Sequence, residues 1–252
     1  MKSIFKILSI KISRVIYLIL RTLYYFIPIE FQTKIQLKLQ SKLQSKLQSK
    51  LEDNLVSETL IHFNKHFKQS LLFDDKWKIR EHAIKTSLLN DKNNEYYYLE
   101  FGVFEGMTTN YFSKSVEKLY CFDSFEGLKE DWAGTSDPKN AFNLYKKVPK
   151  LNSNVEPVVG WVEDTLENFL KEHNPKINFV HLDMDIYSAT KFTLERLKPY
   201  LVKNAVILFD ELYNYHGWEN GEYKALKEVF NDNEFEYKSF NLLGCQSMIK
   251  LK

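Results

Sequence analysis

The sequence predicts an α/β fold with a doubly wound, mostly parallel sheet and an antiparallel last strand. Three observations lead to this prediction. Five short apolar runs alternate with helix-like segments between residues 96 and 230. Two of these runs end abruptly in acids, and the carboxyl ends of parallel strands are where open α/β sheets bind their ligands. Two further strand-like runs flank a turn at Gly244 with no helix between them, which is typical of a hairpin at the edge of a sheet.

Strands are expected where short apolar or aromatic runs stand between turn residues. Each run suits a buried parallel strand, although a short run in a core helix can show the same pattern. We expect strands at 96–101, 119–122, 158–161, 177–183, 206–209, 235–240 and 246–251, and helices at 107–117, 165–173, 188–197 and just before Phe230.

The two runs that end in acids place four carboxylates at one edge of the predicted sheet. Asp183 and Asp185 end the fourth expected strand, and Asp210 and Glu211 follow the fifth. Such a cluster repels itself unless a cation or a shared proton offsets its charge. Hard divalent cations prefer carboxylate oxygens, so we expect a metal ion, Mg²⁺, at these four residues.

A glycine turn connects the first expected strand to the first expected helix. Gly102 and Gly106 lie between the strand 96–101 and a helix whose first turn contains Thr108. Glycines let the backbone approach a ligand, and the start of a helix offers free N–H groups, so this segment predicts an anion or nucleotide site. Asp123 lies 21 residues beyond Gly102, where nucleotide folds place a ribose-binding carboxylate. The alternative role for Asp123 is that of a turn former.

Composition and charge restrict the class of protein. The chain has 252 residues, enough for one large domain with an appendage, and its two cysteines fit a reducing cytoplasm better than a disulfide framework. The first 50 residues carry a net charge of +9, with eight Lys and two Arg against one Glu, which leaves −7 for the rest of a chain whose total is +2. The basic arm suggests an anionic partner for that arm, and the acidic remainder argues against nucleic acid binding.

Residues 1–55 are predicted to form a basic amphipathic and low-complexity helical arm. Within residues 2–27 an apolar face opposes basic side chains, which is typical of a helix on a membrane surface and equally of one packed on its own domain or on a second subunit. The uncharged runs are too short to span a bilayer. Residues 34–55 repeat Ser-Lys-Leu-Gln, which favours a solvated spacer over self-association into a homo-oligomer. We expect a cytoplasmic protein, at the inner face of the membrane if the arm binds lipid.

Residues 56–95 are predicted to be a helical cap over the α/β segment, which extends from 96 to 252. Three histidines, His62, His66 and His82, lie in this cap, and the first two are four residues apart. No acid motif accompanies them at metal-binding spacing, so we expect surface or packing roles for them.

Four segments together resemble class I S-adenosylmethionine-dependent methyltransferases. The segments read YLEFGVFEGMTT, FDSFEGL, HLDMDIYSAT and FDELYNYHGWENGEYKAL, and the likeness extends over residues 96–252. Within this class the sequence is most similar to the macrocin O-methyltransferase-like group, which methylates sugar hydroxyls with Mg²⁺. The combined motifs are specific, whereas each alone is not. The resemblance implies a Rossmann-like methyltransferase domain with S-adenosylmethionine and Mg²⁺ as cofactors.

The resemblance also implies roles for the matching positions. The implied cofactor-binding residues are Glu100, Gly102, Gly106, Thr108, Asp123, Ser124, Glu163 and Asp164. The implied metal-binding residues are Asp183, Asp185, Asp210 and Glu211. Asp123 would bind the ribose and Glu163 or Asp164 the adenine, although Asp164 could equally cap the helix that follows it. Two positions depart from the family pattern, because Phe104 replaces a middle glycine and Glu211 replaces the usual Asp.

These features predict an O-methyltransferase that acts on a hydroxyl of a sugar or glycoconjugate, so the partner is a small-molecule or glycan acceptor. A sugar hydroxyl is a poor acid, which calls for a metal and a general base. Asp185 is one candidate base, and His216 is another because the free pKa of histidine is about 6.5. His216 could also simply order its loop. Tyr213, Trp218 and Tyr223 are expected either to stack on the sugar or to pack beneath the loop.

Three other classes of protein fit parts of the pattern. A metal-dependent glycosyltransferase would hold a sugar nucleotide with Asp183-x-Asp185 but would leave the glycine turn and Asp123 unexplained. A dehydrogenase is disfavoured by the absent middle glycine and by the acid cluster. A membrane-tethered scaffold without enzymatic activity would depend on residues 1–55 to recruit its partners.

Overall fold

The computed structural model describes residues 28–252 of the chain. Residues from Leu55 onward form one compact unit, and the described residues before Leu55 belong to another. The amphipathic helix predicted at residues 2–27 lies outside the described residues, whereas the Ser-Lys-Leu-Gln repeat is helical and belongs to α2 (Ile29–Phe67). Within the described part of the chain, no helix combines the length and the apolarity that a membrane crossing needs.

The elements of the compact unit lie close to the predicted positions. The strands are β1 (Leu71–Phe73), β2 (Tyr97–Phe101), β3 (Leu119–Asp123), β4 (Val155–Val159), β5 (Ile177–Leu182), β6 (Leu201–Phe209), β7 (Phe235–Asn241) and β8 (Ser247–Leu251). The α-helices are α3 (Lys76–Leu88), α4 (Met107–Phe112), α5 (Val162–His173), α6 (Tyr187–Leu197) and α7 (Glu222–Val229). The 3₁₀ turns are η1 (Ser113–Ser115), η2 (Lys198–Tyr200) and η3 (Trp218–Asn220).

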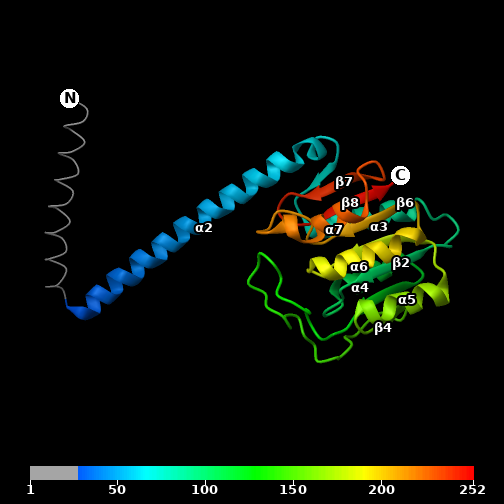
Figure 1. Cartoon of the computed structure of the whole chain (residues 1–252), viewed down its shortest axis with the longest axis horizontal. Coiled ribbons are helices and arrows are strands. Elements are labelled where there is room, and N and C mark those ends of the chain that lie inside the picture. The colour runs from blue at the N-terminus through cyan, green and yellow to red at the C-terminus, as the bar shows by residue number, and fades with distance from the viewer. Residues whose placement is uncertain (1–27) are drawn as a thin grey trace. The chain divides into compact units, whose positions relative to one another are not determined.

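Over the described residues, eight strands form one sheet in the order β1-β7-β8-β6-β5-β2-β3-β4 (Figure 1). The neighbours from β4 to β6 are parallel, and β8 runs antiparallel to both β6 and β7. The chain winds outward from β2 in one direction and from β5 in the other, so the topological switch point lies between β2 and β5. The prediction of a doubly wound, mostly parallel sheet with an antiparallel last strand is confirmed.

Two predictions about individual elements need correction. Residues 56–95 are not helical throughout, because they contain β1, which pairs in parallel with β7 at the edge of the sheet. A strand of three residues is too short to show a periodic pattern of its own. The helix expected at 107–117 ends as α4 at Phe112, and η1 continues the turn.

Helices cover both faces of the sheet. On one face α5, α6 and α7 pack side by side and contribute Leu166, Leu194 and Ala225 to the larger core. On the other face α3 and α4 contribute Ile84 and Phe112 to a second core. Parallel strands that are covered on both faces must be apolar on both, which is why β5 and the second half of β6 are continuously buried.

Phe63 anchors the last turns of α2 on the larger core. Its side chain is fully buried, and its ring centroid lies 5.3 Å from those of Tyr213 and Trp218 and 5.6 Å from that of Phe240. Such aromatic pairs contribute about 0.5–1.5 kcal/mol each beyond the area that they bury. The contact joins the segment before the sheet to the loop that follows β6.

Replacement of Phe63 by alanine is expected to lower the free energy of unfolding by about 3–5 kcal/mol, because the surrounding rings can fill the cavity only in part. Leu60→Ala, one turn earlier and about half exposed, is the matched control and should change the free energy of unfolding by less than about 1 kcal/mol. Urea unfolding followed by circular dichroism measures both values. Equal losses for the two variants would show that this segment does not dock through Phe63.

Candidate active site

The acids meet because the tips of three neighbouring strands are held at one level. The backbone N–H of Asp183 donates to the carbonyl of Phe101 (2.8 Å), and that of Asp210 donates to the carbonyl of Leu182 (2.9 Å). These bonds extend the parallel pairing by one residue beyond β5 and β6. The side chains that follow the two strands therefore converge at the carboxyl edge of the sheet, beside the switch point.

Asp183, Asp185 and Glu211 form a group of three carboxylates. One oxygen from each lies within 4.8 Å of the others. Burial raises the pKa of Asp183 and of Glu211 well above the usual range, and the charge of Asp210 raises both further. Burial and the same charge raise the pKa of Asp185 to about 7. The group is therefore short of positive charge.

Two further details, one of the backbone and one of a side chain, support a functional role for this group. Asp185 has a left-handed backbone (φ 63°), an uncommon conformation for a residue other than glycine that is frequent at functional sites. The Oε2 atom of Glu211 is buried and has no hydrogen-bond partner among the described residues. Buried polar atoms are nearly always paired, so this oxygen is a candidate ligand atom.

Asp210, the fourth acid, has partners of its own. Its Oδ1 accepts hydrogen bonds from Arg80 Nη2 (2.5 Å) and His181 Nε2 (3.2 Å), and its Oδ2 accepts one from Gln246 Nε2 (3.0 Å). Burial alone would raise the pKa of Asp210, but the bond from His181 and the charges of His181 and Arg80 hold this pKa well below its usual range. Asp210 is thus ionised and already compensated.

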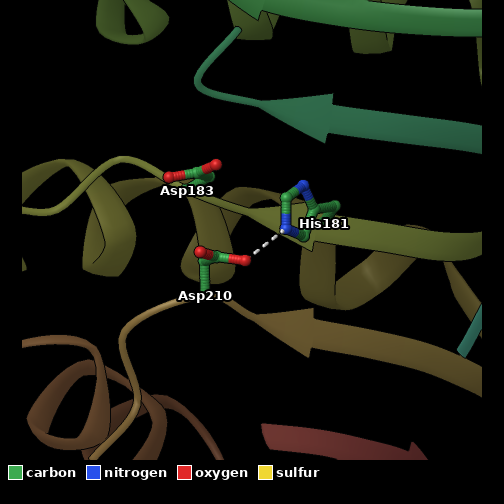
Figure 2. A group of neighbouring side chains, drawn as sticks. All are labelled: His181, Asp183 and Asp210. Carbon is green, nitrogen blue, oxygen red and sulfur yellow. Dashed lines mark hydrogen bonds and ion pairs between the residues drawn. The ribbon is translucent and has the colours of Figure 1, made fainter. Parts of the chain in front are cut away.

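His181 links Asp210 to a further buried acid, Glu100, on the neighbouring strand β2. Figure 2 shows His181 on β5, Asp183 just beyond the end of β5 and Asp210 just beyond the end of β6, with the imidazole turned to Asp210. Its Nδ1 lies 2.9 Å from Oε1 of Glu100, which stands directly opposite in the β2–β5 register. Burial alone would lower the pKa of His181, but the bonds to Asp210 and Glu100 raise it to about 10. The imidazole is therefore doubly protonated and donates to both acids.

Glu222, the first residue of α7, lies under the cluster. It is fully buried, and its Oε2 accepts the backbone N–H of Glu211 (3.0 Å). Burial raises the pKa of Glu222 well above its usual range, and the charges of Asp183 and Asp210 raise it further. By accepting the backbone N–H of Glu211, Glu222 fixes the backbone at that residue.

A cavity of about 320 Å³ opens between the glycine turn and the acids. Its lining includes Gly102, Val103, Phe104, Asp123, Ser124, Phe142, Trp161, Glu163, Asp183, Asp185 and Glu211. Gly102 allows this arrangement, because a Cβ atom there would lie 1.7 Å from the carbonyl oxygen of Asp183. Phe104 keeps a left-handed backbone (φ 47°), so this position retains a glycine-like conformation although it carries a side chain.

Asp123 shapes the glycine turn from below. Its Oδ2 accepts the backbone N–H groups of Val103 (2.8 Å) and Phe104 (2.9 Å), and its Oδ1 accepts that of Phe125 (2.7 Å). The role of turn former is thus observed. A carboxylate has about four lone-pair sites, so the same side chain can still accept hydrogen bonds from ribose hydroxyls at the cavity wall.

Glu163 and Asp164 separate at the start of α5. Glu163 lines the cavity and pairs with Lys129 (2.6 Å), whose ammonium also lies 4.6 Å from the centre of the Trp161 ring. Asp164 is exposed and lines no part of the cavity. The capping role considered for Asp164 is corrected, because α5 begins at Val162 with Trp161 as its N-cap.

Other predicted site residues lie outside the cavity wall. Glu100 is buried and hydrogen-bonded to His181, and it does not line the cavity. Gly106 and Thr108 are buried at the start of α4. His216 is exposed and does not line the cavity, while its carbonyl oxygen packs against Gly134. The geometry therefore favours Asp185 over His216 as a base.

The aromatic residues after β6 pack in the core. Tyr213 and Trp218 are each about 1% exposed, which rules out stacking on a ligand in this conformation. The Tyr223 hydroxyl lies 2.6 Å from His62 Nε2, and His66 and His82 contact the rings of Tyr237 and Phe73. The packing alternative holds for these aromatic residues and for the three histidines.

Sequence reasoning missed Arg80, His181, Glu222 and Gln246. A signal existed for His181, because a histidine inside an otherwise apolar run must have a buried partner, and Glu100 interrupts the neighbouring run in the same way. Arg80 and Gln246 gave no local signal. They reach Asp210 from α3 and from the turn before β8, and these contacts exist only once the sheet is assembled.

Comparisons with known proteins agree with this architecture. A family model described as a methyltransferase domain matches residues 99–212. The crystal structure of CalS11, a calicheamicin methyltransferase, aligns with a TM-score of 0.57 at 18% identity over 82% of this chain and 92% of that one. The O-methyltransferase NovP aligns with a TM-score of 0.52 at 16% identity over 69% and 78%. No curated protein sequence matches the chain.

Residues 99–212 match the methyltransferase-domain model, and the fold is that of class I methyltransferases. The chain carries the methyltransferase domain at residues 99–212, so the predicted resemblance and the prediction of an enzyme are confirmed. The glycosyltransferase, dehydrogenase and scaffold alternatives are not supported. The methyl donor of this class is S-adenosylmethionine.

The cavity fits this cofactor. Asp123 presents a carboxylate for ribose hydroxyls, and Phe104, Phe142 and Trp161 present apolar faces. The chemistry of the lining therefore agrees with the class to which the fold belongs.

Replacement of Arg80 is expected to destabilise the fold, because the buried charge of Asp210 then loses its cationic partner. Arg80→Met keeps an unbranched apolar side chain but removes the cation, and should lower the free energy of unfolding by about 3–5 kcal/mol. The control is Lys78→Met, two residues away on α3, which breaks only a solvent-exposed pair with Asp74. Urea midpoints at pH 7 compare the two. An Arg80→Met midpoint equal to that of Lys78→Met would contradict the assignment.

Proposed function

We propose that the protein is a Mg²⁺-dependent O-methyltransferase that transfers the methyl group of S-adenosylmethionine to a hydroxyl of a sugar or glycoconjugate. One observation carries the proposal. Three carboxylates, Asp183, Asp185 and Glu211, converge beside the cofactor cavity with raised pKa values and one unpaired buried oxygen. Protons or a cation must offset the charge of this arrangement, and its oxygens are suitable ligands for Mg²⁺.

The structural neighbours support the choice of a sugar hydroxyl. CalS11 is described as a TDP-rhamnose 3'-O-methyltransferase, and its apo structure aligns with a TM-score of 0.51 at 20% identity over 82% of this chain and 94% of that one. NovP is described as an O-methyltransferase. At this identity the likeness concerns the fold, so the acceptor class rests on the acidic rim, which suits a weakly acidic hydroxyl.

Asp183 and Glu211 would hold the Mg²⁺ ion, with Asp185 as either the third ligand or the general base. When bound, the ion would lower the pKa of the acceptor hydroxyl, as Zn²⁺ lowers that of bound water from about 15.7 to about 7, though more weakly. Asp210 would act from behind the site. Its bonds to Arg80 and His181 keep it ionised and leave the other three acids free to face the cavity.

Asp185 is the proposed general base, or else the third metal ligand. A base works best when its pKa is near the working pH, and burial raises the pKa of Asp185 to about 7. The hydroxyl oxygen attacks the methyl carbon in line with the leaving sulfur, and its proton passes to Asp185. The carbon–sulfur bond breaks, and the sulfonium becomes the neutral thioether of S-adenosylhomocysteine. The protein's part is to align the oxygen, the methyl carbon and the sulfur.

Asp123 and Glu163 are the proposed contacts to the rest of the cofactor. Asp123 would bind the ribose hydroxyls, Glu163 the adenine amino group, and Gly102 and Ser124 would border the methionine and ribose parts. A role of the basic arm at residues 1–55 in membrane contact or in self-association remains a prediction. A glycan precursor near a membrane would fit such an arm.

Asp183→Ala is expected to reduce methyl transfer by at least about 10²-fold, because it removes a metal ligand next to the reacting oxygen. Binding of S-adenosylhomocysteine should persist, because the glycine turn and Asp123 are untouched. Isothermal calorimetry with S-adenosylhomocysteine and release of labelled methyl from the donor measure the two properties.

Glu172→Gln, at an exposed position on α5, is the matched control for loss of a negative charge and should preserve both properties. If Asp183→Ala lost cofactor binding but kept Mg²⁺ binding, the proposed division of roles would be refuted.

A further inference from the structure

A second cavity of about 320 Å³ adjoins the cofactor cavity. It lies between the β1–α3 turn, the loop after β3 and the β7–β8 turn. Trp132 and Glu211 line both cavities and form the partition between them. A ligand in the second cavity would therefore contact Glu211, a member of the carboxylate group, from outside the cofactor cavity.

The partition is built into the packing of the loops. Gly134 approaches the loop after β6 so closely that a Cβ atom there would lie 1.6 Å from the carbonyl oxygen of His216. Beside this contact the rings of Trp132 and Tyr215 lie 5.7 Å apart. The loop that carries Trp132 is thus seated against the segment that carries Glu211.

The far wall of the second cavity is polar and uncharged. Asn241 Nδ2 donates to Gln246 Oε1 (2.6 Å), and Gln246 Nε2 donates to Asp210 (3.0 Å). A Cβ atom at Gly244 would lie 2.4 Å from Asn241 Nδ2, so the turn leaves room for these amides only because it has a glycine. With Thr135 and Tyr215 on the same lining, the wall offers amides, hydroxyls and an aromatic face, which are the groups that bind sugars.

The charges around this cavity do not suit an anion. Lys76 is the one basic residue on the lining, and it stands next to Asp74 and Asp75. The start of α3 would be an anion site, but Oδ1 of Asp75 already accepts the backbone N–H groups of Trp77 (2.8 Å) and Lys78 (3.0 Å). A phosphate at this position would have to displace a carboxylate of the chain and lie against a second.

We propose that this second cavity is the acceptor subsite and that it takes an uncharged polyhydroxyl ligand, the sugar end of a neutral glycoside, in preference to a nucleotide diphosphate sugar. The proposal rests on the function proposed above and names the acceptor class for the same site. The hydroxyl to be methylated would lie where the two cavities meet, beside Trp132 and Glu211, in contact with the methyl group of the cofactor.

The test is saturation-transfer NMR on the full chain with S-adenosylhomocysteine filling the cofactor cavity. The probes are methyl α-rhamnoside and methyl β-glucoside as neutral ligands and dTDP-glucose as the charged one. At least one of the two methyl glycosides should bind more tightly than dTDP-glucose. Leu243→Trp, at an exposed lining position on the rim, should weaken glycoside binding about tenfold, whereas Leu242→Trp, exposed in the same turn but off the lining, should not.

Three results would overturn the proposal: tighter binding of dTDP-glucose, equal effects of the two Trp variants, or no glycoside binding while S-adenosylhomocysteine binds. Failure of S-adenosylhomocysteine to bind the unmodified chain would instead refute the proposed function.

A variant with altered charge provides a second, independent test. Replacing Asp74 and Asp75 together by Asn keeps a capping side chain at α3 but removes two negative charges. Binding of dTDP-glucose should rise about tenfold, and glycoside binding should stay within about twofold. An unchanged affinity for dTDP-glucose would contradict the charge argument.

Discussion

Mutual repulsion among the acids at the tips of β5 and β6 is the constraint to which the surrounding structure responds. Four carboxylates meet there in partly or fully buried positions, and burial makes each charge costly. The chain compensates one of them, Asp210, with Arg80, His181 and Gln246. Within residues 28–252, Asp183, Asp185 and Glu211 form no salt bridge, although the charge of His181 acts to lower the pKa of Asp183. This unequal treatment separates a structural acid from three acids that face the cavity.

The compensation forms a buried row of alternating charges across the sheet. Glu100, His181, Asp210 and Arg80 follow one another from β2 through β5 and β6 to α3, and each is joined to the next by a hydrogen bond. Buried ion pairs contribute little net stability compared with apolar packing, but they specify geometry. We infer that this row of hydrogen-bonded residues fixes the ends of the strands relative to α3. It also explains why the segment before the matched domain is part of the functional unit.

The central parallel strands could be predicted from the sequence because they are buried on both faces and stand out as apolar runs; these are β2, β3, β5 and the second half of β6. The acids that end β5 and β6 were predicted for the same reason. Gly102 and Asp123 were placed correctly at the cavity from spacing alone. The short strand β1 was missed because three residues carry no period. Arg80 and Gln246 were missed because their partner Asp210 is 130 and 36 residues away, and only the assembled fold brings them together. Asp183, Asp185 and Glu211 could be grouped from the sequence, but the tie that removes Asp210 from this group could not.

The most direct test of this account is whether the three carboxylates exchange protons for a cation. Burial and the charge of Asp210 raise the pKa of Asp185 to about 7, so this side chain is protonated in part of the metal-free molecules at pH 7, and a bound ion must expel that proton. The pKa values of Asp183 and Glu211 are raised in the same direction. Calorimetric titration of Mg²⁺ at pH 7 in two buffers with different ionisation enthalpies measures the number of protons released. The account predicts net proton release in the unmodified protein, with an affinity for Mg²⁺ that rises with pH through about 7. Absence of Mg²⁺ binding, or binding with no proton release, would contradict it.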